Sequence, residues 1–161
     1  MRFSRFHEAH DNHELQELIA RLEGNKKMPI RTWATYTFKA SCTKEEALGM
    51  FLSYLKWVAV DRETHIMPIP VIERNEMGRV HIHTTLLAPK HLRYNDLHGR
   101  WWRNQGLSHH VNYKQGEGAI PYMVKGHELV ELERAVVCPN HGKGRCRKRC
   151  CYQKWDMWNI C

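Results

Sequence analysis

The sequence predicts an α+β domain in which helices pack on an antiparallel β-sheet. Two observations favour this class: predicted strands alternate with predicted helices, and two neighbouring strands are joined by a short turn. The chain has 161 residues, of which 42% are hydrophobic, so it can bury the core of one compact domain with room for a short appendage. This composition excludes wholesale disorder and the collagen-like and coiled-coil classes.

The first part of the chain predicts two helices separated by a strand. Apolar residues recur at helical spacing over about residues 9–23, where Gly24 ends the helix, and again after a cap at Ser41 or Thr43. Residues 32–38, TWATYTF, alternate and are rich in β-forming residues, which predicts a strand. The two apolar stripes are Leu15, Leu18, Ile19 and Leu22, and then Leu48, Phe51, Leu52 and Leu55.

The middle of the chain predicts a β-hairpin, and mixed elements follow it. Adjacent helix positions face about 100° apart, so one of Trp101 and Trp102 is expected to pack in the core. One of His109 and His110 is expected to face the side of the sheet that carries the chemistry. The predicted elements are strands at 66–74 and 79–88, a helix at 94–104, a strand at 108–114 and a helix at about 118–133.

The C-terminal segment differs in composition from the rest of the chain. Residues 138–161 hold five of the six cysteines and six Lys or Arg residues against one acidic residue, Asp156. A boundary near Val137 therefore divides the chain into a body, 1–137, and a basic Cys-rich tail, 138–161.

The net charge of +8 favours a polyanionic partner, nucleic acid first among them. No apolar run approaches the roughly 18 residues that span a bilayer. The start, MRFSRFHEAH, carries charge without a following apolar stretch, so it does not resemble a secretory signal. We therefore expect an intracellular, cytoplasmic protein with no membrane partner.

The most informative stretch is VHIHTTLL, residues 80–87. Alternate side chains of a strand share a face, so His81, His83 and Thr85 point to one side and the apolar residues point to the core. Two imidazoles side by side suit a divalent metal ion. The alternative is a strand that carries two surface histidines.

The hairpin supplies a third candidate ligand if its turn is the three-residue type that ends in a left-handed glycine. With residues 76–78 as the loop, Glu73 lies opposite His81, and Glu73, His81 and His83 share one face. A two- or four-residue loop would turn Glu73 away, so this prediction depends on Gly78. One carboxylate and two imidazoles are compatible with manganese or magnesium, and also with zinc.

A second constellation is PYMVK, residues 121–125, in the last predicted helix. Tyr122 and Lys125 are three residues apart and therefore neighbours on one helix face, and Pro121 falls in the first turn. A phenol with an ordinary pKa of about 10 is a poor nucleophile at neutral pH, so it needs a metal and a nearby cation. Taken alone, Tyr-x-x-Lys is also typical of ordinary helix surface.

These motifs, in this order, resemble those of the HUH endonucleases, specifically the rolling-circle replication initiators of small plasmids and single-stranded DNA viruses. VIERNEMGRVHIHTTLL resembles their second motif, and GAIPYMVKG resembles their third. TWATYTF has the position and β character of their first motif, the loosest of the three. The resemblance covers about residues 31–130.

The resemblance implies an RRM-like fold with a sheet of about five antiparallel strands, and metal-dependent nicking and rejoining of single-stranded DNA through a 5′-phosphotyrosine. It assigns His81 and His83 as the metal-binding pair, Glu73 as the acidic ligand, Tyr122 as the nucleophile and Lys125 as its cationic neighbour. One tyrosine in the motif favours the single-tyrosine class. The implied partners are an origin sequence in single-stranded DNA and the host replication machinery.

The sequence has no Walker-type Gly-rich loop, and it has no room for a helicase domain. A minimal initiator and a fragment of a longer protein are both compatible with this.

The tail contains a spacing of metal-ligand type, Cys138-x2-His141-x4-Cys146-x3-Cys150, which predicts a structural zinc site. A disordered basic arm with reactive thiols and a set of disulfides are the alternatives. In each case the cations of the tail, Arg145, Arg147, Lys148 and Arg149, would add affinity for nucleic acid.

Three other functions compete with the replication initiator. One is a non-catalytic, zinc-containing regulator that binds nucleic acid, and another is a transposase of the same superfamily. The third is a two-histidine phosphoesterase, because residues 83–86 resemble one copy of its His-x-Thr-x motif. That family needs two copies, and no other histidine of the body is followed two residues later by Ser or Thr.

Overall fold

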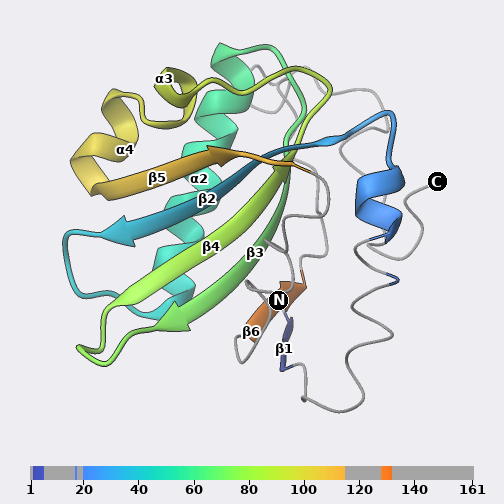
Figure 1. Cartoon of the computed structure of the whole chain (residues 1–161). Coiled ribbons are helices and arrows are strands. Elements are labelled where there is room, and N and C mark those ends of the chain that lie inside the picture. Colours follow the sequence, from blue (N-terminus) through green and yellow to red (C-terminus); the bar gives the residue numbers. More distant parts are fainter. Residues whose placement is uncertain (1, 6–16, 18–19, 115–127, 132–161) are drawn as a thin grey trace.

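The computed structural model describes residues 2–5, 17, 20–114 and 128–131. Within these residues the chain forms one antiparallel sheet in the order β1-β6-β3-β4-β2-β5 (Figure 1). The α+β class and the antiparallel sheet are therefore confirmed. The long strands are β2 (Ile30–Phe38), β3 (Met67–Arg74), β4 (Val80–Leu87) and β5 (Gly106–Asn112), and the short ones are β1 (Arg2–Arg5) and β6 (Glu128–Glu131).

The core forms where helix α2 (Lys44–Asp61) packs on one face of the sheet, behind the strands in Figure 1. Thr43 begins the helix with a capping box: its side chain accepts from the Glu46 N–H, and the Glu46 carboxylate accepts from the Thr43 N–H. The stripe predicted for this helix is confirmed, with Leu52 partly buried and the others fully buried. The core is built from Leu48, Phe51, Tyr54, Leu55 and Val58 of α2 against Ala34, Tyr36, Ile72 and Ile82 of the sheet.

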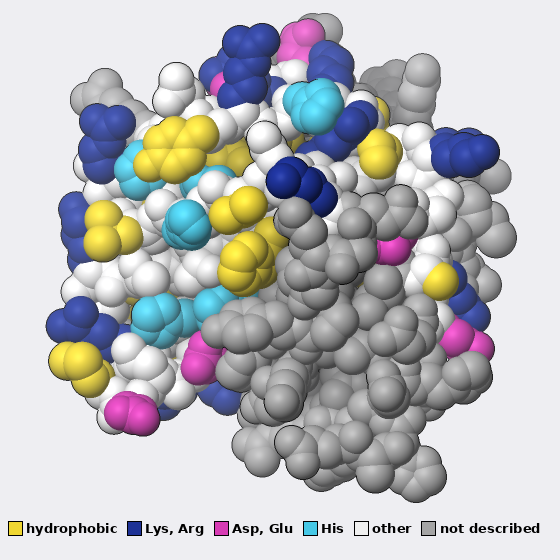
Figure 2. All heavy atoms as spheres, viewed as in Figure 1, with side chains coloured by type: hydrophobic (Ala, Val, Ile, Leu, Met, Phe, Trp, Pro, Cys, Tyr) yellow, Lys and Arg dark blue, Asp and Glu magenta, His cyan; other side chains and the backbone are white. Residues whose placement is uncertain are grey.

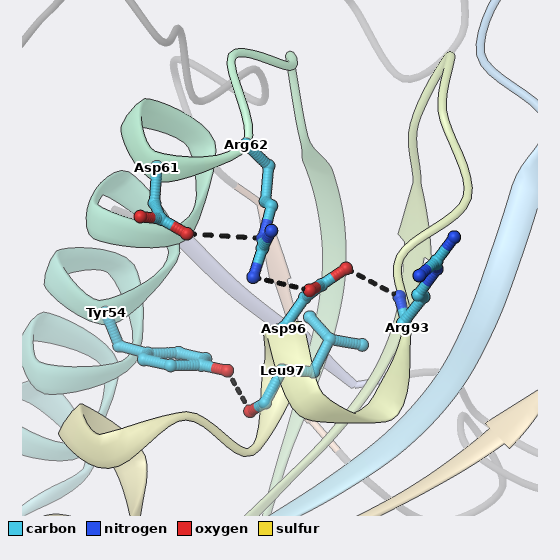
Figure 3. Close-up of polar contacts among 6 residues, drawn as sticks. All are labelled: Tyr54, Asp61, Arg62, Arg93, Asp96 and Leu97. Carbon is cyan, nitrogen blue, oxygen red and sulfur yellow. Dashed lines mark hydrogen bonds and ion pairs between the residues drawn. The ribbon is translucent and has the colours of Figure 1, made fainter.

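Two short helices stand where one helix was predicted over 94–104. They are α3 (Tyr94–Leu97) and α4 (Arg100–Gln105), and Gly99 begins the second. Asp96 fixes α3 to the end of α2, because its carboxylate lies 2.7 Å from the Arg62 guanidinium and accepts from the Arg93 N–H at 3.0 Å (Figure 3). Trp102 is fully buried, as predicted for one of the two tryptophans.

The last predicted helix, 118–133, is wrong over its C-terminal part. Glu128–Glu131 form strand β6, which pairs with β1 and β3. The four residues ELVE are too few to distinguish a helix from a strand by their pattern. They form a strand here because they pair with the edge of β3, where Leu129 lies opposite Val71. Residues 118–127 lie outside the described residues.

The N-terminal elements agree with the predictions in part. Strand β1 was not predicted. Residues 20–24 are helical, which agrees with a helix that ends at Gly24, whereas most of the predicted stretch 9–19 lies outside the described residues. No helix in the described part of the chain is long and apolar enough to cross a membrane.

Gly106 begins β5 at a point of close backbone contact with β2. A Cβ atom there would lie 1.8 Å from the Thr37 carbonyl oxygen and 2.8 Å from its carbon, both of which belong to the backbone. We expect Gly106→Ala to destabilise the protein by about 1–3 kcal/mol or more, because two paired strands must separate to admit the methyl group. Urea unfolding would measure this, with Gly49→Ala as the control, since nothing lies within 4 Å of a Cβ atom at Gly49. Equal stability of the two variants would contradict the expectation.

A chain of polar side chains runs through the core from β5 to α3. His110 lies 3.1 Å from the Tyr36 hydroxyl, and Tyr36 hydrogen-bonds to Tyr54. Tyr54 in turn donates to the Leu97 carbonyl, as Figure 3 shows. Burial raises the pKa of both phenols, so they stay protonated. Burial, with smaller effects from His98 and His109, lowers the pKa of His110 to about 4. His110 is therefore neutral in the folded protein at neutral pH.

This depressed pKa predicts acid sensitivity. Between its ordinary value of 6.5 and about 4, His110 binds a proton more readily in the unfolded chain, so stability is complete above pH 6.5 and falls as the pH drops. The loss is on the order of 3 kcal/mol. We expect His110→Gln to show a smaller fall in the urea midpoint from pH 7 to pH 4.5 than the unaltered protein. An identical fall would show that His110 does not titrate in this way.

Candidate functional site

The β3–β4 hairpin has the turn that the sequence predicted. The Asn75 N–H donates to the Arg79 carbonyl at 2.9 Å, the Gly78 N–H donates to the Asn75 carbonyl at 2.8 Å, and Gly78 has a φ of +75°. Glycine adopts this left-handed conformation without the steric strain that a Cβ atom would add, so Gly78 favours the three-residue loop. Glu73 pairs with His81 across the strands, so the predicted register is confirmed.

The register places Glu73, His81 and His83 on the sheet face opposite α2, which we call the open face. The strand beside β4 extends this row, because Thr35 of β2 pairs with His83 on one side and with His109 of β5 on the other. Figure 2 shows this face, with histidine side chains spread over it and Lys and Arg side chains mainly around its margin.

His83 is held at both ring nitrogens. Its Nε2 lies 2.8 Å from Glu73 Oε2, and its Nδ1 lies 2.9 Å from the Thr35 hydroxyl. A carboxylate only accepts hydrogen bonds, so Nε2 donates to Glu73 and the hydroxyl can donate to Nδ1 of the neutral ring. The His83 side chain is 12% exposed and that of Glu73 is 36% exposed, so the pair lies at the edge of solvent. Thr35 therefore orients the ring toward the carboxylate.

His81 is held by the turn. Asn75 Oδ1 accepts from the Arg79 N–H at 2.9 Å, which directs the Asn75 amide nitrogen to His81 Nε2 at 3.1 Å. The amide donates, so Nε2 of His81 carries a lone pair. Burial lowers the pKa of His81, His83 and Arg79 lower it further, and Glu73 opposes them. The ring is neutral at pH 7, which is the form that binds metal ions.

The three predicted ligands lie on one face, and Glu73 and His83 are in direct contact. In the described ranges no group of three or more His, Cys, Asp or Glu side chains is arranged to hold a metal ion. The donor chemistry of one carboxylate and neutral imidazoles nevertheless fits a divalent cation at Glu73 and His83. His81 would join them only by giving up its contact with Asn75.

A cavity of about 460 Å³ borders His81 where β2, β4 and β5 meet the hairpin. Lys39 and Arg79 supply positive charge to its lining, and Met77 and Leu107 supply exposed apolar surface, at 77% and 69% exposure. Cations beside apolar side chains suit the backbone and the bases of a nucleic-acid strand.

The remaining predicted site residues lie outside the part of the chain that the structure describes, so their roles stay predictions. They are Tyr122 and Lys125, the tail ligands Cys138, His141, Cys146 and Cys150, and the tail cations Arg145, Arg147, Lys148 and Arg149.

Sequence reasoning missed Thr35 and Asn75, the two residues that orient the histidines. Asn75 adjoins the predicted loop, so the turn type itself signals its proximity to His81. Thr35 belongs to the predicted strand TWATYTF, but only the pairing of β2 with β4 shows that it faces His83. His109 shares the open face, as expected for one of the two histidines, and His110 faces the core.

Comparison of the chain with protein-family models, with curated proteins and with solved structures finds no match.

Proposed function

We propose that this chain is a metal-dependent endonuclease and strand transferase for single-stranded DNA, of the HUH type that its motifs resemble, and that it initiates rolling-circle replication. The observation that carries the proposal is the hairpin register, which sets Glu73, His81 and His83 on one sheet face with Glu73 and His83 in contact. An antiparallel sheet with its main helix on the opposite face is compatible with the RRM-like fold of that superfamily.

Glu73, His81 and His83 would hold the metal ion, which is manganese or magnesium in this proposal. When bound, such an ion supplies Lewis acidity toward a phosphate oxygen. Thr35 would keep the His83 ring aimed at this position, with its hydroxyl accepting from Nδ1 once Nε2 has given up its proton to bind the ion. Asn75 holds the neutral His81 ring in place until its amide releases Nε2 to the ion.

Tyr122 would act as the nucleophile. The phenol gives up its proton as its oxygen forms a bond to phosphorus, the bond from phosphorus to O3′ breaks, and the departing O3′ takes up a proton to become a hydroxyl. Lys125 would stabilise the negative charge that develops on the tyrosine oxygen or the phosphate. The 5′-phosphotyrosine conserves the energy of the phosphodiester, so a later 3′-hydroxyl rejoins the strand without ATP.

The DNA strand would run along the cationic cavity beside His81, where Lys39 and Arg79 can contact phosphates. The basic tail, 138–161, would add electrostatic affinity. Its Cys138, His141, Cys146 and Cys150 would bind a structural zinc ion. Elemental analysis of protein prepared without chelator should find one zinc per chain, and protein free of zinc would remove this part of the proposal.

The test of the function is an adduct assay. The full chain is incubated with a pool of single-stranded oligonucleotides and Mn²⁺, and then run on a denaturing gel. We expect a covalent protein–DNA species that chelator prevents, with the DNA mapped to Tyr122 by mass spectrometry. DNA binding without any adduct, under Mn²⁺, Mg²⁺ or Zn²⁺, would overturn the proposal that this chain is an endonuclease.

A non-catalytic regulator is the second candidate, and a specific observation favours it. Both histidines already have hydrogen-bond partners, His83 in Glu73 and Thr35 and His81 in Asn75, as structural histidines would. This candidate predicts DNA binding that is insensitive to removal of divalent metal, whereas the enzyme requires the metal for cleavage.

A further inference from the structure

A second cavity, of about 540 Å³, lies away from the histidine pair, between the core-facing side of β2 and β5 and the segment that leads into α3. Its volume falls within the roughly 300–1,000 Å³ of small-molecule sites. None of the described residues that line it is acidic. The lining consists of Thr32, His91, Leu92, Arg93, Tyr94, His110 and Asn112.

Two polar atoms of this lining are buried without a hydrogen-bond partner among the described residues, and both belong to paired strands. They are the Thr32 hydroxyl, on a residue that is 2% exposed, and Nδ1 of His110. Thr32 pairs with Asn112, and His110 pairs with Ala34, so the two side chains come from neighbouring positions on one face. A buried polar atom without a partner destabilises the protein, and a ligand that hydrogen-bonds to it recovers this loss.

The hydrogen bonds around these two atoms show that both can act as acceptors. Tyr54 donates to the Leu97 carbonyl and Tyr36 donates to Tyr54, so the Tyr36 oxygen receives the N–H of His110 Nε2. Nδ1 of the neutral ring then carries a lone pair, and the Thr32 hydroxyl can accept as well as donate. A ligand that satisfies both atoms must bring a hydrogen-bond donor to Nδ1 of His110, and it can offer a second donor to the Thr32 hydroxyl.

The rim of the cavity differs from its buried part, because it carries a guanidinium group and an exposed aromatic ring. The Arg93 guanidinium extends away from Asp96, which contacts only the backbone N–H of that residue (Figure 3). His91 is exposed beside it, 3.5 Å from the Arg31 guanidinium. Tyr94 adds an aromatic ring that is 53% exposed and stacks on His98 with 5.2 Å between ring centroids. The rim therefore suits an anion and a planar ring.

We infer that this cavity binds a nucleotide, with the phosphate at Arg93 and His91 and the donors of the base or sugar at Thr32 and His110. A nucleotide combines the three properties that complement this lining: negative charge, hydrogen-bond donors and a flat ring. The same chemistry can come from a free nucleotide or from one unit of a single strand. The inference does not rest on the proposed function, since no proposed metal ligand contributes to the cavity.

The test is isothermal titration of the full chain with the four deoxynucleoside monophosphates, with inorganic phosphate and with oligothymidylate. We expect the monophosphates to bind at least tenfold more tightly than phosphate. Arg93→Gln should weaken nucleotide binding about tenfold, and the isosteric Thr32→Val should weaken it severalfold. Arg103→Gln is the matched control, because Arg103 is an exposed arginine of α4 that does not line the cavity.

Loss of free-nucleotide binding in the Arg93 and Thr32 variants would support a free nucleotide as ligand. Loss confined to oligothymidylate would support a unit of a strand. Phosphate that binds as tightly as the nucleotides, or Arg93→Gln and Thr32→Val variants that melt normally and bind like Arg103→Gln, would overturn the inference. His83→Ala should keep this binding, so failure of the cleavage proposal and failure of the cavity are separable.

Discussion

Replacement of Tyr122 with phenylalanine should abolish the covalent protein–DNA adduct. Phenylalanine keeps the ring but lacks the oxygen that would bond to phosphorus, and the predicted third motif, GAIPYMVKG, contains one tyrosine. The 5′ end of the downstream fragment stays on the protein, so an oligonucleotide labelled at its 3′ end should shift to the mass of the adduct. A label at the 5′ end should instead report a shorter, free fragment. Both products should disappear in the variant.

Tyr113→Phe is the matched control. The Tyr113 hydroxyl donates to Glu23 Oε1 at 2.6 Å, so this phenol has a structural hydrogen bond. We expect this variant to retain the adduct, with some loss of thermal stability. An adduct that persists in Tyr122→Phe and is lost in Tyr113→Phe would move the nucleophile to another residue and would remove the resemblance of PYMVK to a catalytic motif.

The hairpin shows how far local sequence can specify a site. The turn length, set by Gly78, and the alternation of residues 80–87 together determine which side chains share a face, and both are local properties. The loop length and this alternation therefore predict Glu73 opposite His81 without any knowledge of the rest of the sheet. The same logic could not say whether the two rings would turn toward Glu73, because side-chain rotamers depend on neighbours that come from other strands.

Those neighbours are the part that local reasoning could not reach. Thr35 lies 48 residues before His83 in the chain and contacts it only because β2 pairs with β4. Strand β6 was missed for the same reason, since ELVE acquires its strand structure from pairing with β1 and β3. Where a short segment fits two structures, the partner decides, and the partner is a property of the whole fold.

His109 and His110 illustrate the value of register once a partner is known. Adjacent residues of a strand point to opposite faces, so the pairing of Thr35 with His109 puts His109 on the open face and leaves His110 in the core. One residue of shift would exchange their environments and would bury His109 beside Tyr36 instead. The acid sensitivity expected of His110 and the cavity that it lines both depend on this register.

His83→Ala should reduce cleavage by roughly 100-fold or more while leaving most DNA binding intact. His83 is held at both ring nitrogens, by Thr35 at Nδ1 and by Glu73 at Nε2. Its removal would take away one proposed metal ligand and one partner of the Glu73 carboxylate. DNA affinity should persist because the Lys and Arg side chains proposed to contact phosphates are unchanged. Single-turnover cleavage and a binding titration at the same salt concentration would measure the two effects separately.

His109→Ala supplies the control on the same face. His109 lies on β5, separated from β4 by β2, so its removal tests whether any histidine of this surface matters or only those of the hairpin. Thr35→Val should give an intermediate loss of about 10-fold, since it removes the hydrogen bond to Nδ1 that orients the His83 ring but leaves the ring in place. If cleavage required the metal through Glu73 and the two hairpin histidines, raising the Mn²⁺ concentration should partly rescue Thr35→Val and should fail to rescue His83→Ala. Unchanged cleavage in His83→Ala would remove the metal site, and with it the reason to read the hairpin as catalytic.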